Sequence, residues 1–310
     1  MSQYTLHKPV LFLVFNRPGV TGKVFEAIRN AQPPRLYVAA DGPRDSVATD
    51  KQACEATRKL ITDGIDWECD VKKLFREQNL GCRDAVSSAI DWFFEHEEDG
   101  IILEDDCLPG EDFFRFCSEM LDYYLDNEKI MHISGSNFNF GKRYGDADYY
   151  FSRYAMVWGW ASWRRAWKLY DKNLDSLNDF IEQDAEKLIP DASQRKRFIE
   201  IFKKVRNHDA EFNTWDIQWF YSVMRNYGLA VQPNVNLISN IGFTADPTHK
   251  INTPEIADIH RESIPVNIKH TKKLTPCLEA DNFTFKYFQK KRLSSVKDII
   301  IKILKHFEIK

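Results

Sequence analysis

Short apolar runs alternate with amphipathic segments through the first third of the chain. Residues 9–15 form a nearly unbroken run of β-branched and aromatic side chains, which is typical of a strand buried on both faces. Similar runs predict strands at residues 35–40 and 100–104, and a more polar segment predicts a third strand at residues 71–76. The segments between the strands predict helices that begin near residues 19, 50 and 83. Strands and helices alternating at this spacing predict an α/β fold with a parallel sheet and right-handed crossovers.

Polar side chains follow each predicted strand at its carboxyl end. They are Arg17, Asp41, Asn79, and Asp105 with Asp106. In parallel sheets a ligand binds outside the carboxyl ends of the strands, so these side chains are expected to outline one cleft. A cation, acids and an amide are the groups that would hold a nucleotide diphosphate with its metal ion.

The acidic triplet Glu104-Asp105-Asp106 lies at the end of the fourth predicted strand. Neighbouring carboxylates at the rim of a sheet repel one another unless a cation or a set of hydrogen-bond donors neutralises them. We expect a divalent metal ion in this role, and the alternative is a solvated acidic turn.

The next third of the chain is rich in aromatic residues. Residues 112–124 predict an amphipathic helix, and residues 130–137 predict a strand that runs into a loop of small residues. Residues 157–167 contain four tryptophans, which form either a buried cluster or a platform for a sugar ring. Asp216 lies between large aromatic residues at positions 212–219, where partial burial would favour a catalytic base.

The last part of the chain is less regular. A polar loop at residues 244–250 contains His249, which we expect either to be exposed or to reach a metal ion or a phosphate. Residues 252–278 predict irregular structure. Residues 295–307 predict an amphipathic helix with lysines beside its apolar stripe, and this helix is expected to dock on the rest of the protein or, alternatively, on a membrane surface.

Composition and motifs narrow the classes of function. The formal net charge of the 310 residues is -3, which argues against a nucleic-acid binder that relies on a basic surface. The six cysteines show no C-x-x-C pair, and neither a signal peptide nor a membrane-spanning run is found, so we expect a cytoplasmic protein. A phosphate loop would need glycine where the chain has Arg17, and no G-x-G-x-x-G follows the first strand.

The chain resembles a glycosyltransferase of the GT-A type, an α/β fold with a Rossmann-like, mostly parallel sheet flanked by helices. The closest pattern is that of the N-acetylglucosaminyltransferase I family and its bacterial relatives that decorate surface polysaccharides. The resemblance covers about residues 9–250, and its most specific parts are Glu104-Asp105-Asp106, Gly159-Trp160, and Trp215-Asp216 followed by Trp219.

The resemblance implies roles for the acidic triplet and for two other strand ends. Asp106 would ligate the divalent metal ion, Mn or Mg, that bridges the diphosphate of the donor. Asp105 would lie near the ribose and the donor sugar, and Glu104 would contact the donor. Arg17 and Asp41 match positions that hold the nucleotide base and its ribose or phosphate.

Further roles follow from the remaining motifs. Asp216 matches the catalytic base, and Trp160 matches a residue of the donor site. The loop ending in His249 resembles a segment that orders over the donor, so His249 is a second candidate metal ligand. Where the family often has a histidine, after the third strand, this chain has Asn79, Gly81 and Arg83. Asn79 and Arg83 are therefore the candidates for nucleotide binding there, and the base, which the family leads us to expect as uridine, stays open.

Together these expectations describe a metal-dependent inverting glycosyltransferase. One base opposite the leaving group implies a single displacement, and therefore inversion at the anomeric carbon. The expected partners are a nucleotide-diphosphate sugar and a glycan or lipid-linked glycan acceptor. Two alternatives stay open. A sugar nucleotidyltransferase would be expected to carry a Gly-rich loop with Lys or Arg after the first strand, and the other alternative is a non-catalytic carbohydrate-binding or scaffold protein.

The expected domain organisation has two parts. A GT-A-like domain would span residues 1–262, with a nucleotide-sugar half at 1–108 and an acceptor half at 109–262. Residues 263–310 would form a C-terminal extension. Contact of its amphipathic helix with a membrane would place the protein at the inner membrane face.

Overall fold

The computed structural model describes residues 4–209, 212–245, 256 and 259–289. Within these residues the strands of the larger sheet are β1 Val10–Val14, β2 Arg35–Ala40, β3 Asp70–Phe75, β4 Asp99–Glu104, β6 Ile130–Ser134, β7 Tyr149–Ser152, β8 Trp160–Trp163 and β9 Leu229–Pro233. Up to residue 245 the helices are α1 Pro18–Ala31, α2 Asp50–Gly64, α3 Gly81–His96, α4 Phe113–Tyr123, α5 Arg164–Trp167, α6 Leu177–Gln183, α7 Ala185–Leu188, α8 Ala192–Arg206, α9 Asp216–Arg225 and α10 Gly242–Ala245. The strands and helices expected in the first third of the chain are confirmed.

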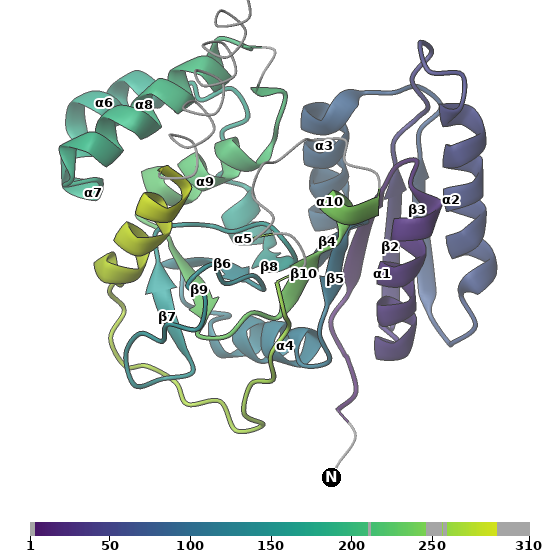
Figure 1. Cartoon of the computed structure of the whole chain (residues 1–310), viewed down its shortest axis with the longest axis horizontal. Coiled ribbons are helices and arrows are strands. Elements are labelled where there is room, and N and C mark those ends of the chain that lie inside the picture. The colour runs from purple at the N-terminus through teal and green to yellow at the C-terminus, as the bar shows by residue number, and fades with distance from the viewer. Residues whose placement is uncertain (1–3, 210–211, 246–255, 257–258, 290–310) are drawn as a thin grey trace, which may run out of the picture.

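The strands form one sheet with the order β3-β2-β1-β4-β8-β6-β9-β7 in the described part of the chain (Figure 1). The first four of these are mutually parallel, β8 is antiparallel to both of its neighbours, and β6 and β9 again point the same way as β4. The edge strand β7 is antiparallel to β9. The predicted α/β class, with a mostly parallel sheet flanked by helices, is confirmed.

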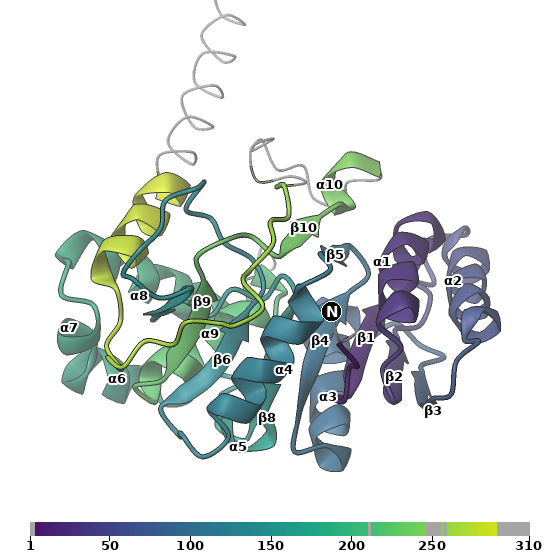
Figure 2. The same cartoon turned by 90° about the horizontal axis from the view of Figure 1, so that it is seen from below.

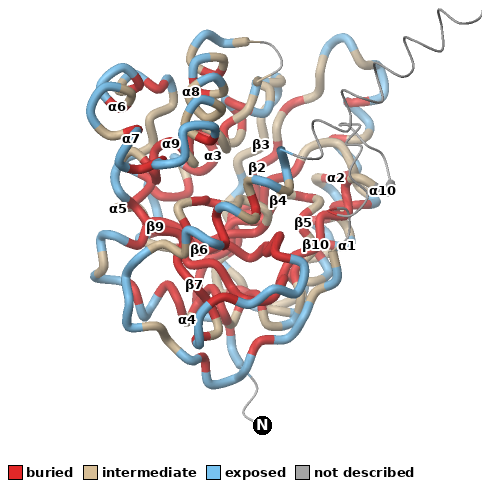
Figure 3. The backbone as a smooth tube through the Cα atoms, turned by 60° about the vertical axis from the view of Figure 1, so that its left-hand side comes forward, coloured by how far each residue is buried: buried red, intermediate tan, exposed pale blue. Residues whose placement is uncertain are grey.

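Helices cover both faces of the sheet because the central strands are apolar on both sides. Along β1, Val10, Phe12 and Val14 pack in a core cluster with α1, α2 and α4. The intervening Leu11 and Leu13 pack in a second cluster with α3, α5 and α9. Figure 2 shows α1 and α3 on opposite sides of the sheet, and Figure 3 shows buried residues concentrated in its strands. This double burial explains the unbroken apolar runs in the sequence.

A short second sheet was not expected from the sequence. Strand β5, Cys107–Pro109, pairs antiparallel with β10, Ile238–Asn240, immediately after the acidic triplet. Pro109 is the last residue of β5, a position at the edge of a sheet where proline is tolerated. The pairing brings the start of α10 to the acidic residues.

The C-terminal segment returns along the outer strand. Phe151 in β7 bridges Pro276, and Cys277 donates its backbone N–H to the Phe151 carbonyl at 2.7 Å. A helix then begins at residue 278 and continues to residue 289 (Figure 2). The described part of the predicted irregular tail is irregular as expected. The amphipathic helix predicted at residues 295–307 lies outside the described residues.

The two halves predicted at residues 1–108 and 109–262 share the larger sheet, because β4 pairs directly with β8. The division into two halves and an extension stays a prediction. None of the helices in the part of the chain described here has the length and apolar character needed to cross a membrane.

Candidate functional site

A cavity of about 420 Å³ opens at the carboxyl ends of β1, β2 and β4. Leu13 and Ala39 of the strands, with Ala85 and Ala89 of α3, supply apolar lining. The polar side chains that line it are Asn16, Arg17, Asp41, Arg44, Arg76, Asn79, Glu104, Asp105, Asp106 and Asn213. The polar residues expected at the strand ends therefore lie around one cavity.

Arg17 is the counter-ion of the acidic triplet. Its guanidinium donates to both carboxylate oxygens of Asp105, and its Nη2 also donates to Asp106 Oδ2 at 3.0 Å. These side chains are largely enclosed, with 20%, 6% and 17% of Arg17, Asp105 and Asp106 exposed. Burial acts to lower the pKa of Arg17, but the two carboxylates outweigh it and raise the pKa above its usual value. The positive charge that we expected from a metal ion is thus supplied in part by arginine.

The carboxyl groups of the triplet repel one another. Burial is the main cause that raises the pKa of Glu104 well above its usual value, and the neighbouring charges of Asp106, Asp105 and Asp216 add to it. Burial also raises the pKa of Asp105, although Arg17 acts in the opposite direction. The triplet is therefore a place where added positive charge would be favourable.

The backbone at the start of α10 covers this ion pair. A Cβ atom built on Gly242 would lie 2.4 Å from Asp106 Oδ2 and 3.0 Å from Arg17 Nη1. Ile241 donates its N–H to the Asp106 carbonyl at 2.9 Å, which fixes the chain at this point. Only glycine allows so close an approach of the backbone.

Asp41 has a structural role in the cavity wall. Its Oδ1 accepts from Gly42 N and Leu80 N, and its Oδ2 accepts from Asn79 Nδ2 and Gly81 N, at 2.9 to 3.1 Å. Asn79 also donates to the Gly42 carbonyl at 2.8 Å. A carboxylate has about four acceptor positions, so these bonds leave Asp41 little capacity for a nucleotide. Its arrangement fits the shaping of the α3 N-terminus better than the ligand contact we expected.

Two further arginines reach the cavity that the sequence analysis did not single out. The Arg44 guanidinium donates two hydrogen bonds to Asp50, at 2.5 and 3.0 Å, and its carbon lies 5.4 Å from the centroid of the Phe15 ring. Arg76 donates to Ser88 Oγ at 2.8 Å. Arg76 ends the third predicted strand, so the rule that led us to Arg17, a polar residue at a strand end, also points to it. Asn213, also missed, adjoins the aromatic segment that contains Asp216.

Asp216 begins α9, next to the cavity but outside the lining formed by the described residues. Its Oδ1 accepts from Thr214 Oγ1 and from the N–H of Ile217. The charge of Asp216 is a minor cause of the raised pKa of Glu104, after burial and the charges of Asp106 and Asp105. Asn213, three residues before it, lines the cavity itself.

Arg83 does not reach the cavity, contrary to expectation. Its side chain points to the segment before α6, where it donates to the Lys172 carbonyl at 2.9 Å and to Asn173 Oδ1 at 3.2 Å, and it contacts His208 Nδ1 at 2.6 Å. Because α3 turns by about 100° per residue, Arg83 and the cavity-lining Cys82 project in different directions. Arg83 thus joins two parts of the chain and is unavailable to a nucleotide.

Trp160 also does not line the cavity, contrary to expectation. Its side chain is 0% exposed, and its ring stacks on Trp215 and His132 with centroids 5.7 and 5.1 Å away. An indole enclosed in this way has no open face for a sugar, so the buried-cluster interpretation holds for Trp160. Trp158, in contrast, is half-buried, and its ring lies 5.1 Å from Phe138.

The two predicted metal ligands are Asp106 and His249, and the structure describes only the first of them. His249 lies outside the described residues. Among the described residues no three His, Cys, Asp or Glu side chains are grouped so as to hold a metal ion. The carboxylate of Asp106 lines the cavity, and hard oxygen ligands suit Mg or Mn. The residues therefore fit a divalent ion in ligand type, provided that other ligands come from a bound molecule and that Arg17 moves.

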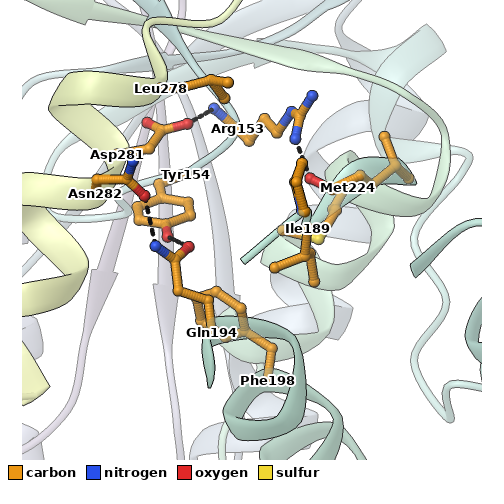
Figure 4. Close-up of a pocket in the computed structure, with 11 residues that line it drawn as sticks. Arg153, Tyr154, Ile189, Gln194, Phe198, Met224, Leu278, Asp281 and Asn282 are labelled. Atoms are coloured by element: carbon orange, nitrogen blue, oxygen red, sulfur yellow. Dashed lines mark hydrogen bonds between the residues drawn. The ribbon is translucent and has the colours of Figure 1, made fainter. Parts of the chain in front are cut away.

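A second, smaller cavity of about 80 Å³ lies between α8 and the C-terminal helix. Figure 4 shows Gln194 between Tyr154 and Asn282, and Asp281 at the backbone N–H of Arg153. The polar side chains around this cavity hydrogen-bond to one another. These bonds hold the C-terminal helix in place and leave few free groups for a ligand.

Comparison with known proteins gives only distant similarities. No protein-family model and no curated protein matches the sequence. UDP-glucose pyrophosphorylase complexed with UDP-glucose has a TM-score of 0.38 at 11% identity, covering 76% of this chain and 94% of its own. Mouse xyloside xylosyltransferase 1 has a TM-score of 0.35 at 11% identity over 71% and 81% of the two chains. A cytidylyltransferase from Leptospira borgpetersenii serovar Hardjo-bovis has a TM-score of 0.31 at 12% identity over 59% and 74%. Scores below 0.5 support no transfer of activity, so the functional argument depends on the site itself.

Proposed function

We propose that this protein is an inverting glycosyltransferase that transfers a sugar from a nucleotide-diphosphate donor to a glycan hydroxyl with the help of Mn or Mg. The observation that carries the proposal is the cavity at the carboxyl ends of parallel strands, which Arg17, Arg44 and Arg76 line together with the acidic triplet. Guanidinium groups bind phosphate oxygens in pairs of hydrogen bonds, and carboxylates ligate divalent ions. The cavity therefore contains groups that suit the phosphates and groups that suit the metal ion of a metal diphosphate.

The proposed reaction uses groups on two sides of the donor sugar. The acceptor oxygen attacks the anomeric carbon, its proton passes to Asp216, and the bond from that carbon to the diphosphate oxygen breaks. The electron pair leaves with the diphosphate, whose charge Arg17, Arg44 and Arg76 stabilise. Asp106 would hold the metal ion, which when bound acts as a Lewis acid on the leaving group.

Thr214 and Ile217 prepare Asp216 for the role of base. They donate to Oδ1, which holds the carboxylate in one orientation and leaves Oδ2 to accept the proton. Asp216→Asn keeps the oxygen that receives both bonds but cannot take a proton. We expect this variant to bind donor normally and to lose roughly a hundredfold to ten-thousandfold in transfer rate.

The connection between β1 and α1 favours glycosyl transfer over nucleotidyl transfer. Val14 ends the strand and Pro18 begins the helix, so three residues join them. This is too short for the Gly-rich loop expected in a nucleotidyltransferase. Release of pyrophosphate from a nucleoside triphosphate and a sugar 1-phosphate would overturn our choice, whereas release of a nucleoside diphosphate from a sugar nucleotide would support it.

The first test is binding. Purified protein is titrated with UDP-, GDP-, CMP- and dTDP-sugars in the presence of Mn and again with a chelator, and the melting temperature is followed. A ligand that binds the native state raises this temperature by mass action, so a metal-dependent rise with one sugar nucleotide is expected. Asp106→Asn should abolish the metal dependence. No rise with any sugar nucleotide would favour a non-catalytic carbohydrate-binding protein.

The acceptor and the cellular site belong to the same proposal. We propose a glycan or lipid-linked glycan as acceptor and a cytoplasmic location, with residues 295–307 docking on the rest of the protein or, alternatively, on a membrane surface. Trp158 supports an acceptor site beside α10, because its half-buried ring lies 5.7 Å from that of Phe243, the residue after Gly242. Removal of residues 295–310 should release the protein from vesicles of anionic lipid if this segment docks on the membrane.

A further inference from the structure

Arg17 occupies one of the two carboxylate oxygens of Asp106, and the other, Oδ1, is contacted by Cys107 Sγ at 3.6 Å. Arg17 Nη2 lies 3.0 Å from Asp106 Oδ2, while the same guanidinium bonds both oxygens of Asp105. Thr21 Oγ1 lies 3.5 Å from Asp105 Oδ2 and 2.8 Å from the Arg17 carbonyl, which holds the pair from the side of α1. The enclosed surroundings make this interaction stronger than one at an open surface.

A guanidinium and a divalent ion cannot share this position. A divalent ion binds a carboxylate oxygen at roughly 2 to 2.5 Å, so it would lie next to the guanidinium and be repelled by it. The start of α10 leaves little room for both, because even a methyl group on Gly242 would lie 3.0 Å from Arg17 Nη1. Arg17 therefore opposes metal binding to Asp106 in the free protein, and the ion binds tightly only after Arg17 has left this ion pair.

A diphosphate offers Arg17 an alternative partner. The cavity in which the acidic residues lie is also lined by Arg44 and Arg76, so an anion bound there is within the same enclosed space. A phosphate accepts two parallel hydrogen bonds from a guanidinium, as a carboxylate does, so the exchange would keep Arg17 paired. Asp106 would then be released for the metal ion.

We infer that Arg17 is an internal counter-cation that couples metal binding to nucleotide binding: the metal ion binds tightly only when a nucleotide diphosphate draws Arg17 away from Asp106. This inference rests on the proposed function. Because coupling between two ligands is reciprocal, the metal ion must strengthen nucleotide binding by the same factor. Arg17 thereby neutralises part of the charge of Asp105 and Asp106 while no donor is bound.

The test is a titration with Mn in the presence and absence of UDP, GDP or CDP. Binding is measured as the decrease in the electron paramagnetic resonance signal of free Mn. The variants are Arg17→Met and, as a matched control, Arg44→Met. The control also removes one positive charge from the cavity, but this arginine is paired with Asp50 and not with the triplet. We expect nucleotide to strengthen Mn binding to the unmodified protein at least about fivefold. In the absence of nucleotide, Arg17→Met should bind Mn at least about fivefold more tightly than the unmodified protein, and Arg44→Met should change far less.

The outcomes separate the inference from the proposed function. If Mn binding to the unmodified protein depends on nucleotide but Arg17→Met gains no affinity without nucleotide, the coupling role is overturned and the proposed function stands. If neither protein binds Mn or nucleotide under any condition, the proposed function fails as well. Removing Arg17 leaves Asp105 buried and unpaired, which threatens folding. Arg17→Lys keeps a positive charge that cannot span both carboxylates, so it should give an intermediate gain in Mn affinity; no gain in this variant also overturns the inference.

Discussion

At the scale of single residues, the shape of the cavity is fixed in part by a side chain whose acceptor positions are filled by hydrogen bonds within the protein. Asp41 receives four hydrogen bonds, three of them from residues 79–81 at the start of α3. These bonds hold the end of β2 against the loop before α3 and the first residue of α3. Asp41 therefore shapes the site without needing to touch the ligand.

Asp41→Ala is expected to lower the free energy of unfolding by roughly 1 to 3 kcal/mol, because it leaves the N–H groups at the α3 N-terminus without their acceptor. Chemical denaturation followed by circular dichroism would measure the loss. Asp45→Ala, at an exposed position in the loop before α2, is the control and should change stability by less than about 0.5 kcal/mol. Equal stability of the two variants would contradict the structural role.

Gly242 makes a different contribution, because its missing side chain leaves space for the ion pair. Gly242→Ala would place Cβ 2.4 Å from Asp106 Oδ2, so either the carboxylate or the start of α10 must shift. We expect this variant to bind nucleotide more weakly in the presence of metal, as measured by calorimetry. Its melting temperature should change little. The matched control is Gly19→Ala in α1, where an added Cβ meets nothing within 4 Å. Unchanged nucleotide affinity in Gly242→Ala would show that the close approach is incidental.

At the scale of elements, β8 and α5 carry most of the tryptophan-rich segment into the core. Trp160, Trp163 and Trp167 are 0%, 1% and 4% exposed, whereas Trp158, before the strand begins, is half-buried. No single helical or strand periodicity in the sequence distinguishes the buried tryptophans from the half-buried one. The reason is that the segment passes from an irregular stretch to a strand and then directly to a short helix. Their faces are fixed by β4 and β6, with which β8 pairs.

Trp160 provides a test of this assignment. Trp160→Ala should reduce the free energy of unfolding by about 3 to 5 kcal/mol, since it opens a large cavity in the core. Trp160→Phe should cost much less, because it keeps an aromatic ring and removes an indole N–H that is buried without a partner among the described residues. Trp158→Ala should also cost less than Trp160→Ala. Denaturant titration of all three variants is the measurement, and a loss in Trp158→Ala as large as in Trp160→Ala would contradict the assignment.

The elements of the first third could be predicted because their information is local. Each of β1, β2 and β4 is buried on both faces and so reads as an apolar run, and parallel pairing then fixes which ends meet. Arg83 and Asp41 show where this reasoning fails. Both lie near strand ends, but the direction of a side chain on the first turn of a helix and the number of donors around a carboxylate depend on segments distant in sequence. The pairing of β5 with β10 is likewise non-local and leaves no pattern in either strand.

At the scale of the whole molecule, the C-terminal segment closes the far edge of the sheet. It pairs with β7 through Pro276 and Cys277, and its helix from residue 278 to residue 289 packs on α8 through Phe285 and Phe198, whose rings lie 5.6 Å apart. An uncovered edge strand would present free N–H and C=O groups to other chains. The segment thus completes the fold on the side opposite β3.

Asp281 makes this closure dependent on pH. Ser152 Oγ and the Arg153 N–H donate to its carboxyl group, and Figure 4 shows it beside Arg153. Burial raises the pKa of Asp281 to about 6, although these hydrogen bonds act in the opposite direction. In the unfolded chain an aspartate titrates near pH 4. Between about pH 4 and 6 the folded protein therefore holds a proton that the unfolded chain has lost, and stability decreases as the pH rises through this range.

Asp281→Asn cannot titrate, and it retains one oxygen acceptor for the Arg153 N–H. The melting temperature of this variant, measured relative to that of the unmodified protein, should therefore rise between pH 4 and pH 7. The relative gain should be at most about 3 kcal/mol in the free energy of unfolding. Asp126→Asn, at an exposed position after α4, is the control and should show no such trend. A difference between Asp281→Asn and the unmodified protein that is the same at every pH would mean that Asp281 is ionised throughout, and the C-terminal helix would then be held by a charged carboxylate rather than by a protonated one.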